Sequence, residues 1–308
     1  MPAALLVQLG TCFIVVLVKN SITIPPKGGI VIDIMVNFMK RNFRFLSYLL
    51  FFLSAVSAMA QKLPNKQQIG IRAPADINVD GKTAEWHDKF QAYNMNNRIF
   101  YTISNDDNNL YLTIRAGDGF SSEKALFGIG FNIQLPGDKR NKPEEVKIIF
   151  PKYNSVKKTD DLRLMVESAR KREKDTIAAA KRSIDSLSLL ANKAIGIEYK
   201  KVIVSGIETA YPITTTDNKE GIKVAAQFDA SMRFTYEMAL PLKYLGASIN
   251  SGQKFKYYIK MLGQPEVSPN GMPSPQIVGN DMASFFNSDR GFVMLSTDLS
   301  GYYTLVKK

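Results

Sequence analysis

Short runs that alternate apolar and polar residues constrain the fold of this chain more than any other feature. In 127–135 every odd-numbered residue is large and apolar, and every even-numbered residue is glycine or carries an amide. Successive side chains of a strand point to opposite faces. This segment therefore predicts a strand with one buried apolar face and one face of glycine and amide side chains, which we call the thin face. A thin face is typical of places where another backbone or a ligand comes close.

About ten segments of this kind follow one another, and few are separated by enough chain for a crossover helix. A hairpin is predicted where 98–103 and 110–115 flank a turn-rich stretch. The other candidate strands are 146–150, 199–207, 221–228, 234–240, 255–262, 291–295 and 302–306. The pattern predicts an all-β fold, an antiparallel β-sandwich of the jelly-roll or immunoglobulin-like type.

Two segments depart from the strand pattern. Residues 157–193 contain no glycine, proline or aromatic residue, and their apolar residues fall mostly three, four or seven apart, which predicts a long helical insertion, straight or broken near 171–175. Its ten basic and six acidic residues fit a solvated helix face or an arm that binds a partner. Residues 264–290 form a proline-rich loop that ends in two adjacent phenylalanines.

The segment 39–60 has the layout of a secretory signal peptide. Basic residues open it, an apolar run follows at 45–56, and 58–60 reads Ala-Met-Ala before Gln61. The run is shorter than the ~20 apolar residues of a spanning helix. We expect a periplasmic or secreted protein with no membrane anchor after cleavage, a linker at 61–76 and a sandwich domain at 77–308. Residues 1–38 are then a start-site extension, although its apolar stretch also fits a membrane segment.

Composition excludes several chemistries. The chain of 308 residues has a formal net charge of +12, one histidine (His87) and one cysteine (Cys12). No zinc site built from several histidine or cysteine ligands is possible, and cleavage would remove the only thiol. Cleavage would also remove five basic and one acidic residue, which leaves +8. That charge favours anionic envelope polymers as partners, whereas nucleic acid is not expected in that compartment.

Three motifs stand out. Residues 77–86 read Ile-Asn-Val-Asp-Gly-Lys-Thr-Ala-Glu-Trp, 106–112 read Asp-Asp-Asn-Asn-Leu-Tyr-Leu, and 236–242 read Tyr-Glu-Met-Ala-Leu-Pro-Leu. Together they resemble the family-9 carbohydrate-binding modules and the wider group of DOMON-like sandwiches, over 77 to about 262. The resemblance implies a non-catalytic module that binds carbohydrate or glycoconjugate. The helical insertion and the proline-rich loop depart from the family pattern.

The first motif has a physical interpretation of its own. Asp80 and Gly81 supply a tight turn, because glycine tolerates positive φ and the aspartate side chain bonds nearby amides. Trp86, which follows Glu85, is the only tryptophan. We expect its ring to be buried at one end of the core rather than stacked on a sugar. Glu237, in the third motif, is expected to point away from the core, as a ligand contact or at a solvated edge.

A sugar-binding surface needs flat aromatic rings beside planar hydrogen-bonding groups. The alternation leaves five aromatic residues as ligand-binding candidates: Tyr111, Tyr257, Tyr258, Phe285 and Phe286. Asp106 and Asp107 fit a structural calcium site or a metal-free turn, so metal binding stays open, and no other cofactor is expected.

Two other functions stay in view. One is a structural or interaction protein of the cell envelope that binds a protein partner through 157–193. The other is a hydrolase, since carboxylates alone can run glycoside hydrolysis, but no catalytic constellation is readable.

Overall fold

The computed structural model describes residues 4–9, 12–17, 63–87, 89–135, 145–152, 156–173, 178–250, 252–264, 284–285 and 287–307. The chain divides into two compact units, Met1–Lys62 and Leu63–Lys308. In the first unit β1 (Ala4–Leu9) and β2 (Cys12–Leu17) form an antiparallel hairpin. The predicted signal peptide at 39–60 lies outside the described residues.

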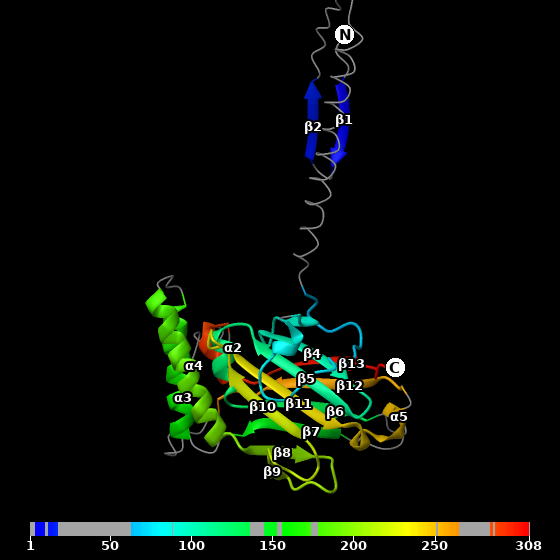
Figure 1. The fold of residues 1–308 in the computed structure, drawn as a ribbon, viewed down its shortest axis with the longest axis vertical. Helices are drawn as coiled ribbons and strands as arrows, with labels where there is room; N and C mark the ends of the chain where they lie inside the picture. The colour runs from blue at the N-terminus through cyan, green and yellow to red at the C-terminus, as the bar shows by residue number, and fades with distance from the viewer. Residues whose placement is uncertain are drawn as a thin grey trace, which may run out of the picture. The chain divides into compact units, whose positions relative to one another are not determined.

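The second unit contains most of the secondary structure (Figure 1). Its strands are β3 (Ala92–Asn94), β4 (Ile99–Asn105), β5 (Asn109–Ala116), β6 (Ile129–Gln134), β7 (Glu145–Lys152), β8 (Lys201–Ser205), β9 (Ile213–Thr215), β10 (Lys223–Phe228), β11 (Phe234–Pro241), β12 (Phe255–Met261) and β13 (Thr297–Tyr303). Its helices are α2 (Gly119–Ala125), α3 (Val156–Arg172), α4 (Ala178–Glu198), α5 (Gly246–Asn250) and α7 (Asp289–Met294), with 3-10 turns η2 (Ala84–Trp86) and η3 (Leu242–Tyr244).

The strands of the second unit form two antiparallel sheets that pack as a sandwich. One sheet has five strands in the order β10-β11-β5-β4-β3, and the other has six in the order β13-β12-β6-β7-β8-β9. The hydroxyls of Tyr101 in β4 and Tyr257 in β12 lie 3.2 Å apart, and the rings of Phe150 in β7 and Tyr236 in β11 are 6.2 Å apart. Side chains from both sheets therefore meet in one core.

Strand β6 shows how the alternation sets the layers. Ile129, Phe131 and Ile133 are fully buried and belong to the core between the sheets. Asn132 and Gln134 are only partly buried, and they lie on the opposite face of the strand. The segment that predicted one buried and one thin face is therefore the third strand counted from the edge strand β13, between β12 and β7.

The outer face of the five-stranded sheet is covered by the chain that precedes β3. Gln227 donates through Nε2 to the carbonyl of Asp80 at 2.7 Å, and the backbone N–H of Gln91 donates to Thr102 Oγ1 at 3.1 Å. In the same segment Trp86 is 5% exposed. Trp86 is thus buried as predicted, but it lies outside the main core cluster rather than closing an end of it.

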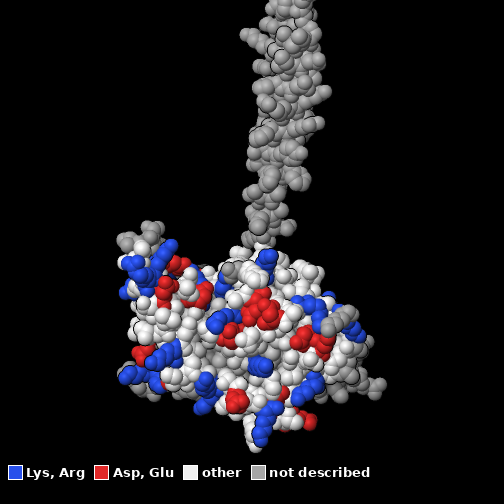
Figure 2. Space-filling view, viewed as in Figure 1, with Lys and Arg blue, Asp and Glu red and all other residues white. Residues whose placement is uncertain are grey.

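The predicted helical segment forms α3 and α4, broken between Arg172 and Ala178. The pair is anchored to the sandwich by Glu123 of α2, whose carboxylate lies 3.7 Å from Arg163 and 3.4 Å from Arg170. Basic side chains gather on this part of the surface (Figure 2). With five helices in the second unit beside the two sheets, the described chain is not all-β.

Two predicted strands near the C-terminus are corrected. Residues 291–295 fall largely in helix α7, because Ser288 caps its first turn by accepting the N–H of Gly291 at 3.0 Å. The last strand spans Thr297–Tyr303 and not 302–306. Most of the proline-rich loop lies outside the described residues.

Candidate functional site

The outer face of the six-stranded sheet carries many partly or fully exposed side chains, and their positions follow from strand register. One row across the sheet places Lys147, Asn132, Tyr258 and Ser300 in successive paired positions. The next row, two residues along each strand, contains Glu145, Gln134, Lys256 and Tyr302. The third pairs Gly130 with Lys260 and Lys260 with Asp298. We call these three rows the open face.

Two tyrosines form the aromatic part of the open face. Tyr302 is 58% exposed, and Tyr258 is partly exposed. They occupy diagonal positions, because Tyr258 pairs with Ser300 and Tyr302 pairs with Lys256. Diagonal neighbours on antiparallel strands lie about 7–8 Å apart, within reach of aromatic side chains. The two rings can therefore contact one extended ligand.

A lysine accompanies each of these rings. Lys256 Nζ lies 4.7 Å from the ring centroid of Tyr258, and Lys254 Nζ lies 5.1 Å from that of Tyr302. Both distances are in the range of cation–π attraction. A hydrogen bond with Tyr258 raises the pKa of Lys256 above its ordinary value, so its ammonium stays charged at neutral pH.

An amide acceptor at the centre of the open face has no partner. Asn132 lies between Lys147 and Tyr258 in register, and its Oδ1 is buried without a hydrogen-bond partner among the described residues. Buried acceptors are nearly always paired in folded proteins, so this oxygen is an exception. The amides and glycines at even positions in 127–135 are the sequence signal that points to this place.

The five predicted aromatic candidates separate into different environments. Tyr258 lies on the open face. Tyr257 is fully buried and Tyr111 is 7% exposed, so both predictions were wrong as exposed ligand contacts. Phe285 is partly buried at the end of the proline-rich loop, and Phe286 lies outside the described residues.

Strand geometry explains these outcomes. Tyr257 precedes Tyr258 on β12 and must point to the opposite face, where its hydroxyl meets Tyr101. Tyr111 lies against its own turn and donates to Asp106 Oδ2 at 2.7 Å. Tyr302 is not among the predicted residues, because the expected strand 302–306 starts where β13 almost ends.

The turn motif serves a structural role on the other sheet. Glu237 is 2% exposed on β11, and its Oε2 accepts the backbone N–H groups of Asp80 at 3.2 Å and Gly81 at 3.1 Å. Glu85 Oε1 accepts the N–H of Asn78 at 3.3 Å. Glu237 was expected as a ligand contact or at a solvated edge, and its burial contradicts the solvated edge. It points away from the core as predicted, but the turn covers it.

The buried carboxyl of Glu237 is perturbed by this environment. Desolvation raises its pKa to about 8, and the nearby Glu85 and Asp80 carboxylates act in the same direction against the two N–H donors. Glu237 Oε1 and Glu85 Oε2 are buried without a partner among the described residues. The described chain holds no group of three or more His, Cys, Asp or Glu side chains placed to bind a metal ion.

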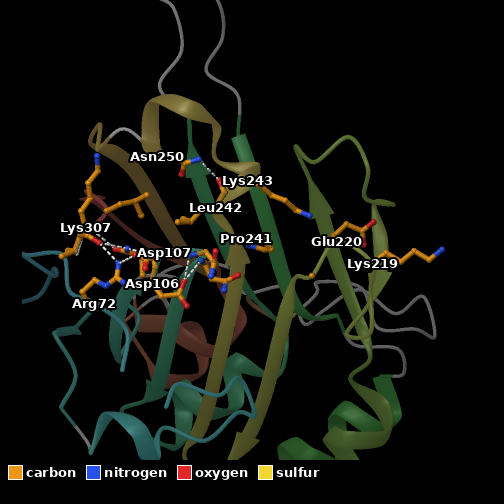
Figure 3. Close-up of a pocket in the computed structure, with 16 residues that line it drawn as sticks. Arg72, Asp106, Asp107, Lys219, Glu220, Pro241, Leu242, Lys243, Asn250 and Lys307 are labelled. Atoms are coloured by element: carbon orange, nitrogen blue, oxygen red, sulfur yellow. Dashed lines mark hydrogen bonds and ion pairs between the residues drawn. The ribbon is translucent and has the colours of Figure 1, made fainter. Parts of the chain in front are cut away.

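A polar cleft of about 760 Å³ lies where the turn before β5 meets the start of η3 (Figure 3). Two of its three acidic side chains, those of Asp106 and Asp107, already have partners in the chain. Asp107 Oδ1 accepts from Arg72 at 2.7 Å, and Asp106 Oδ1 accepts the N–H of Asn108 at 2.7 Å and of Asn109 at 2.6 Å. Despite partial burial, bonds from Tyr111 and these amides lower the pKa of Asp106.

The turn at Asp106 and Asp107 therefore fits the metal-free alternative better than a calcium site. The lysines along the cleft do not converge either: in Figure 3, Lys219 and Lys307 lie at opposite sides and point away from one another. No pair of groups drawn there forms a nucleophile with its base. We therefore do not propose the cleft as the binding site.

A buried lysine was not singled out from the sequence. Lys124 of α2 is fully buried, its Nζ donates to Thr297 Oγ1 at 2.8 Å, and it lies 4.2 Å from the ring centroid of Phe292. Burial, with a further contribution from Arg98, lowers its pKa to about 7. Because solvent does not reach this side chain, it is a packing feature rather than part of a binding surface.

Comparison with known proteins adds no assignment: no family model, curated protein or solved structure matches the chain. Among the helices within the described ranges, none combines the length and the apolar character needed to span a bilayer.

Proposed function

We propose that this chain is an exported, non-catalytic module that binds carbohydrate or glycoconjugate, and that the open face is its binding surface. The observation that carries the proposal is the diagonal placement of two solvent-accessible tyrosines, Tyr258 and Tyr302, each with a lysine beside its ring. Sugar C–H faces stack on aromatic rings, and sugar hydroxyls donate to amide acceptors. A polyhydroxylated ring stacked on Tyr258 would bring a donor toward Gln134, the partly exposed amide in the next row of the open face.

The sandwich supports the same proposal. Residues 92–116 build three strands of one sheet, 129–215 build four strands of the other, and 223–241 return to the first. Such crossing between sheets is typical of jelly-roll and immunoglobulin-like sandwiches. We infer a module similar to the family-9 carbohydrate-binding group. In this module the Asp80–Gly81 turn, bound to Glu237, stabilises the β-sandwich.

Export is the second part of the proposal. It rests on the signal-peptide layout at 39–60 and predicts a periplasmic or secreted product that starts at Gln61. Sequencing the N-terminus of the protein purified from its native cells tests this, and a product that retains Met1 would contradict it.

Binding is tested with a glycan array followed by titration calorimetry on the purified protein. The double variant Tyr258→Ala/Tyr302→Ala should lose binding, since loss of a stacking ring typically costs 1 kcal/mol or more at an interface, about fivefold in affinity. Tyr211→Ala is the matched control: Tyr211 is 79% exposed and lies between β8 and β9, at the edge of the sheet opposite β13. Absence of binding to every neutral and acidic glycan tested would refute the proposal.

One observation keeps the alternative of a partner-binding envelope protein in view. Helix α4 exposes Leu189 at 72%, Leu190 at 56% and Ile197 at 63%, an unusual apolar exposure for a solvated helix. If the insertion binds a protein partner, the variant Leu189→Ser/Leu190→Ser/Ile197→Ser should lose pull-down partners while the melting temperature is retained. If this variant keeps the same pull-down partners, the alternative loses its support.

A further inference from the structure

The charged residues of the open face are unevenly distributed. Strand β12 presents Lys256 and Lys260 on this side. Lys254 lies just before the strand, and β7 adds Lys147. Acidic residues occupy the margins: Asp298 pairs with Lys260 on the edge strand, and Glu145 starts β7. In register, the immediate neighbours of Lys256 are Gln134 and Tyr302, and those of Lys147 are Asn132 and Ser205. The cations next to the tyrosines therefore face neutral groups.

No ion pair within the described residues involves Lys147, Lys254 or Lys256. A cation that has no acidic partner among the described residues can pair with a ligand without breaking a salt bridge to one of them. The side chains of Lys256 and Lys254 lie against rings, with their Nζ atoms at 4.7 and 5.1 Å from the ring centroids of Tyr258 and Tyr302. A sugar that stacks on either ring would carry its ring substituents to these ammonium groups.

The lysines are also spread along one strand, two and four positions apart. Residues two apart on one face of a strand are separated by about 6.7 Å, so Lys254, Lys256 and Lys260 extend over about 20 Å along β12. A single charged group contacts only one of them. A chain with repeated negative charges contacts all three, and stacking on Tyr258 and Tyr302 fixes its position.

We propose that the open face selects anionic saccharides, that is, chains whose sugar rings carry carboxylate or sulfate groups, and that Lys254 and Lys256 read this charge beside the two tyrosine rings. This inference rests on the proposed function of the same surface. It adds the class of ligand and the residues that distinguish that class from neutral glycans.

The test is titration calorimetry on the whole purified protein with matched pairs of ligands. Oligogalacturonate and its methyl ester share one backbone and differ in charge, and dextran sulfate and dextran form a second pair that separates sulfate from carboxylate. We expect each anionic member to bind at least tenfold tighter than its neutral partner, and added salt to reduce the difference, because exposed charges are screened. Lys254→Gln/Lys256→Gln should remove most of the preference, at up to about fivefold for each lysine.

Three controls separate the outcomes. Lys223→Gln/Lys243→Gln removes two exposed lysines of the other sheet and of η3, and it should leave the preference unchanged. Equal affinity for the neutral and anionic members, with Tyr258→Ala/Tyr302→Ala still abolishing binding, would overturn the charge selection and leave the proposed function standing. Anion binding that survives Tyr258→Ala/Tyr302→Ala would overturn the inference as non-specific attraction. Absence of binding to all four ligands would count against both.

Discussion

Glu237 Oε2 accepts the backbone N–H of Gly81 at 3.1 Å, although 156 positions separate the two residues in sequence. This bond joins the first and third of the sequence motifs. The Asp80–Gly81 turn lies on the β10–β11 pair, where Thr235 Oγ1 also donates to the carbonyl of Gly81. The spacing of the motifs therefore reflects the docking of a turn onto a sheet and needs no ligand to explain it.

Stability should depend on pH through Glu237. Its folded pKa of about 8 lies above the ordinary value of 4.5, so folding favours the protonated form. That contribution is fully present below pH 4.5 and is lost as the pH rises through about 8. We expect Glu237→Gln to remove this dependence, measured by urea unfolding between pH 5 and 8.5. Glu237→Ala should instead destabilise by about 1–3 kcal/mol, because two N–H groups lose their acceptor.

Gly81→Ala should destabilise the protein. Gly81 has φ of +85°, and a Cβ at this position would lie 2.9 Å from the backbone of Ala226. Positive φ in a residue with a side chain costs about 1–3 kcal/mol before the clash is added. Gly196→Ala is the matched control, because nothing lies within 4 Å of its added Cβ in α4 and alanine favours helix by up to about 1 kcal/mol. Equal effects of the two variants in thermal unfolding would contradict the turn geometry.

Tyr257 and Tyr258 should respond in opposite ways to substitution. Tyr257→Phe removes a buried hydroxyl that bonds to Tyr101, and we expect a loss of about 1 kcal/mol in stability with no change in glycan affinity. Tyr258→Ala should change stability by about 0.5 kcal/mol or less and weaken glycan binding. Chemical unfolding and calorimetry on both variants measure the two effects. Loss of affinity in Tyr257→Phe alone would place the site elsewhere.

Lys124 should give a second pH dependence of the opposite sign. Burial holds its folded pKa at about 7, below the ordinary value of 10.5. The unfolded chain binds the extra proton between these values, so stability should rise as the pH increases from about 7 to about 10.5. Lys124→Met should flatten this rise and stabilise the protein near pH 7, where the wild-type amine must lose its proton or remain charged in the core. A rise that persists in this variant would refute the assignment.

The local pattern predicted the strands well where alternation was strong. The segment 127–135 indicated both the buried and the thin face of β6, and the lack of glycine and proline in 157–193 indicated the helices. Prediction failed where local signals compete, as at 291–295, where the cap at Ser288 outweighs an apolar run that also suits a strand.

The candidate site could be predicted only in part. Period-two alternation states that Tyr257 and Tyr258 face opposite ways, but it does not state which of them faces the other sheet. Tyr302 requires the register of β13 on β12, a pairing of chain segments about 40 positions apart. The covering of Glu237 depends on a turn some 156 positions away. No local pattern contains these pairings.

The sequence alone determined the period of each element and the chemistry available, because side-chain direction follows from backbone geometry and composition limits the ligands at hand. The tertiary structure alone decided which sheet face the N-terminal segment covers and which one stays open. The Asp80–Gly81 turn bonds to Gln227 and Glu237 on one sheet, and the described residues leave Tyr258 and Tyr302 accessible on the other. Burial is a property of the packed molecule, so no segment carries it by itself.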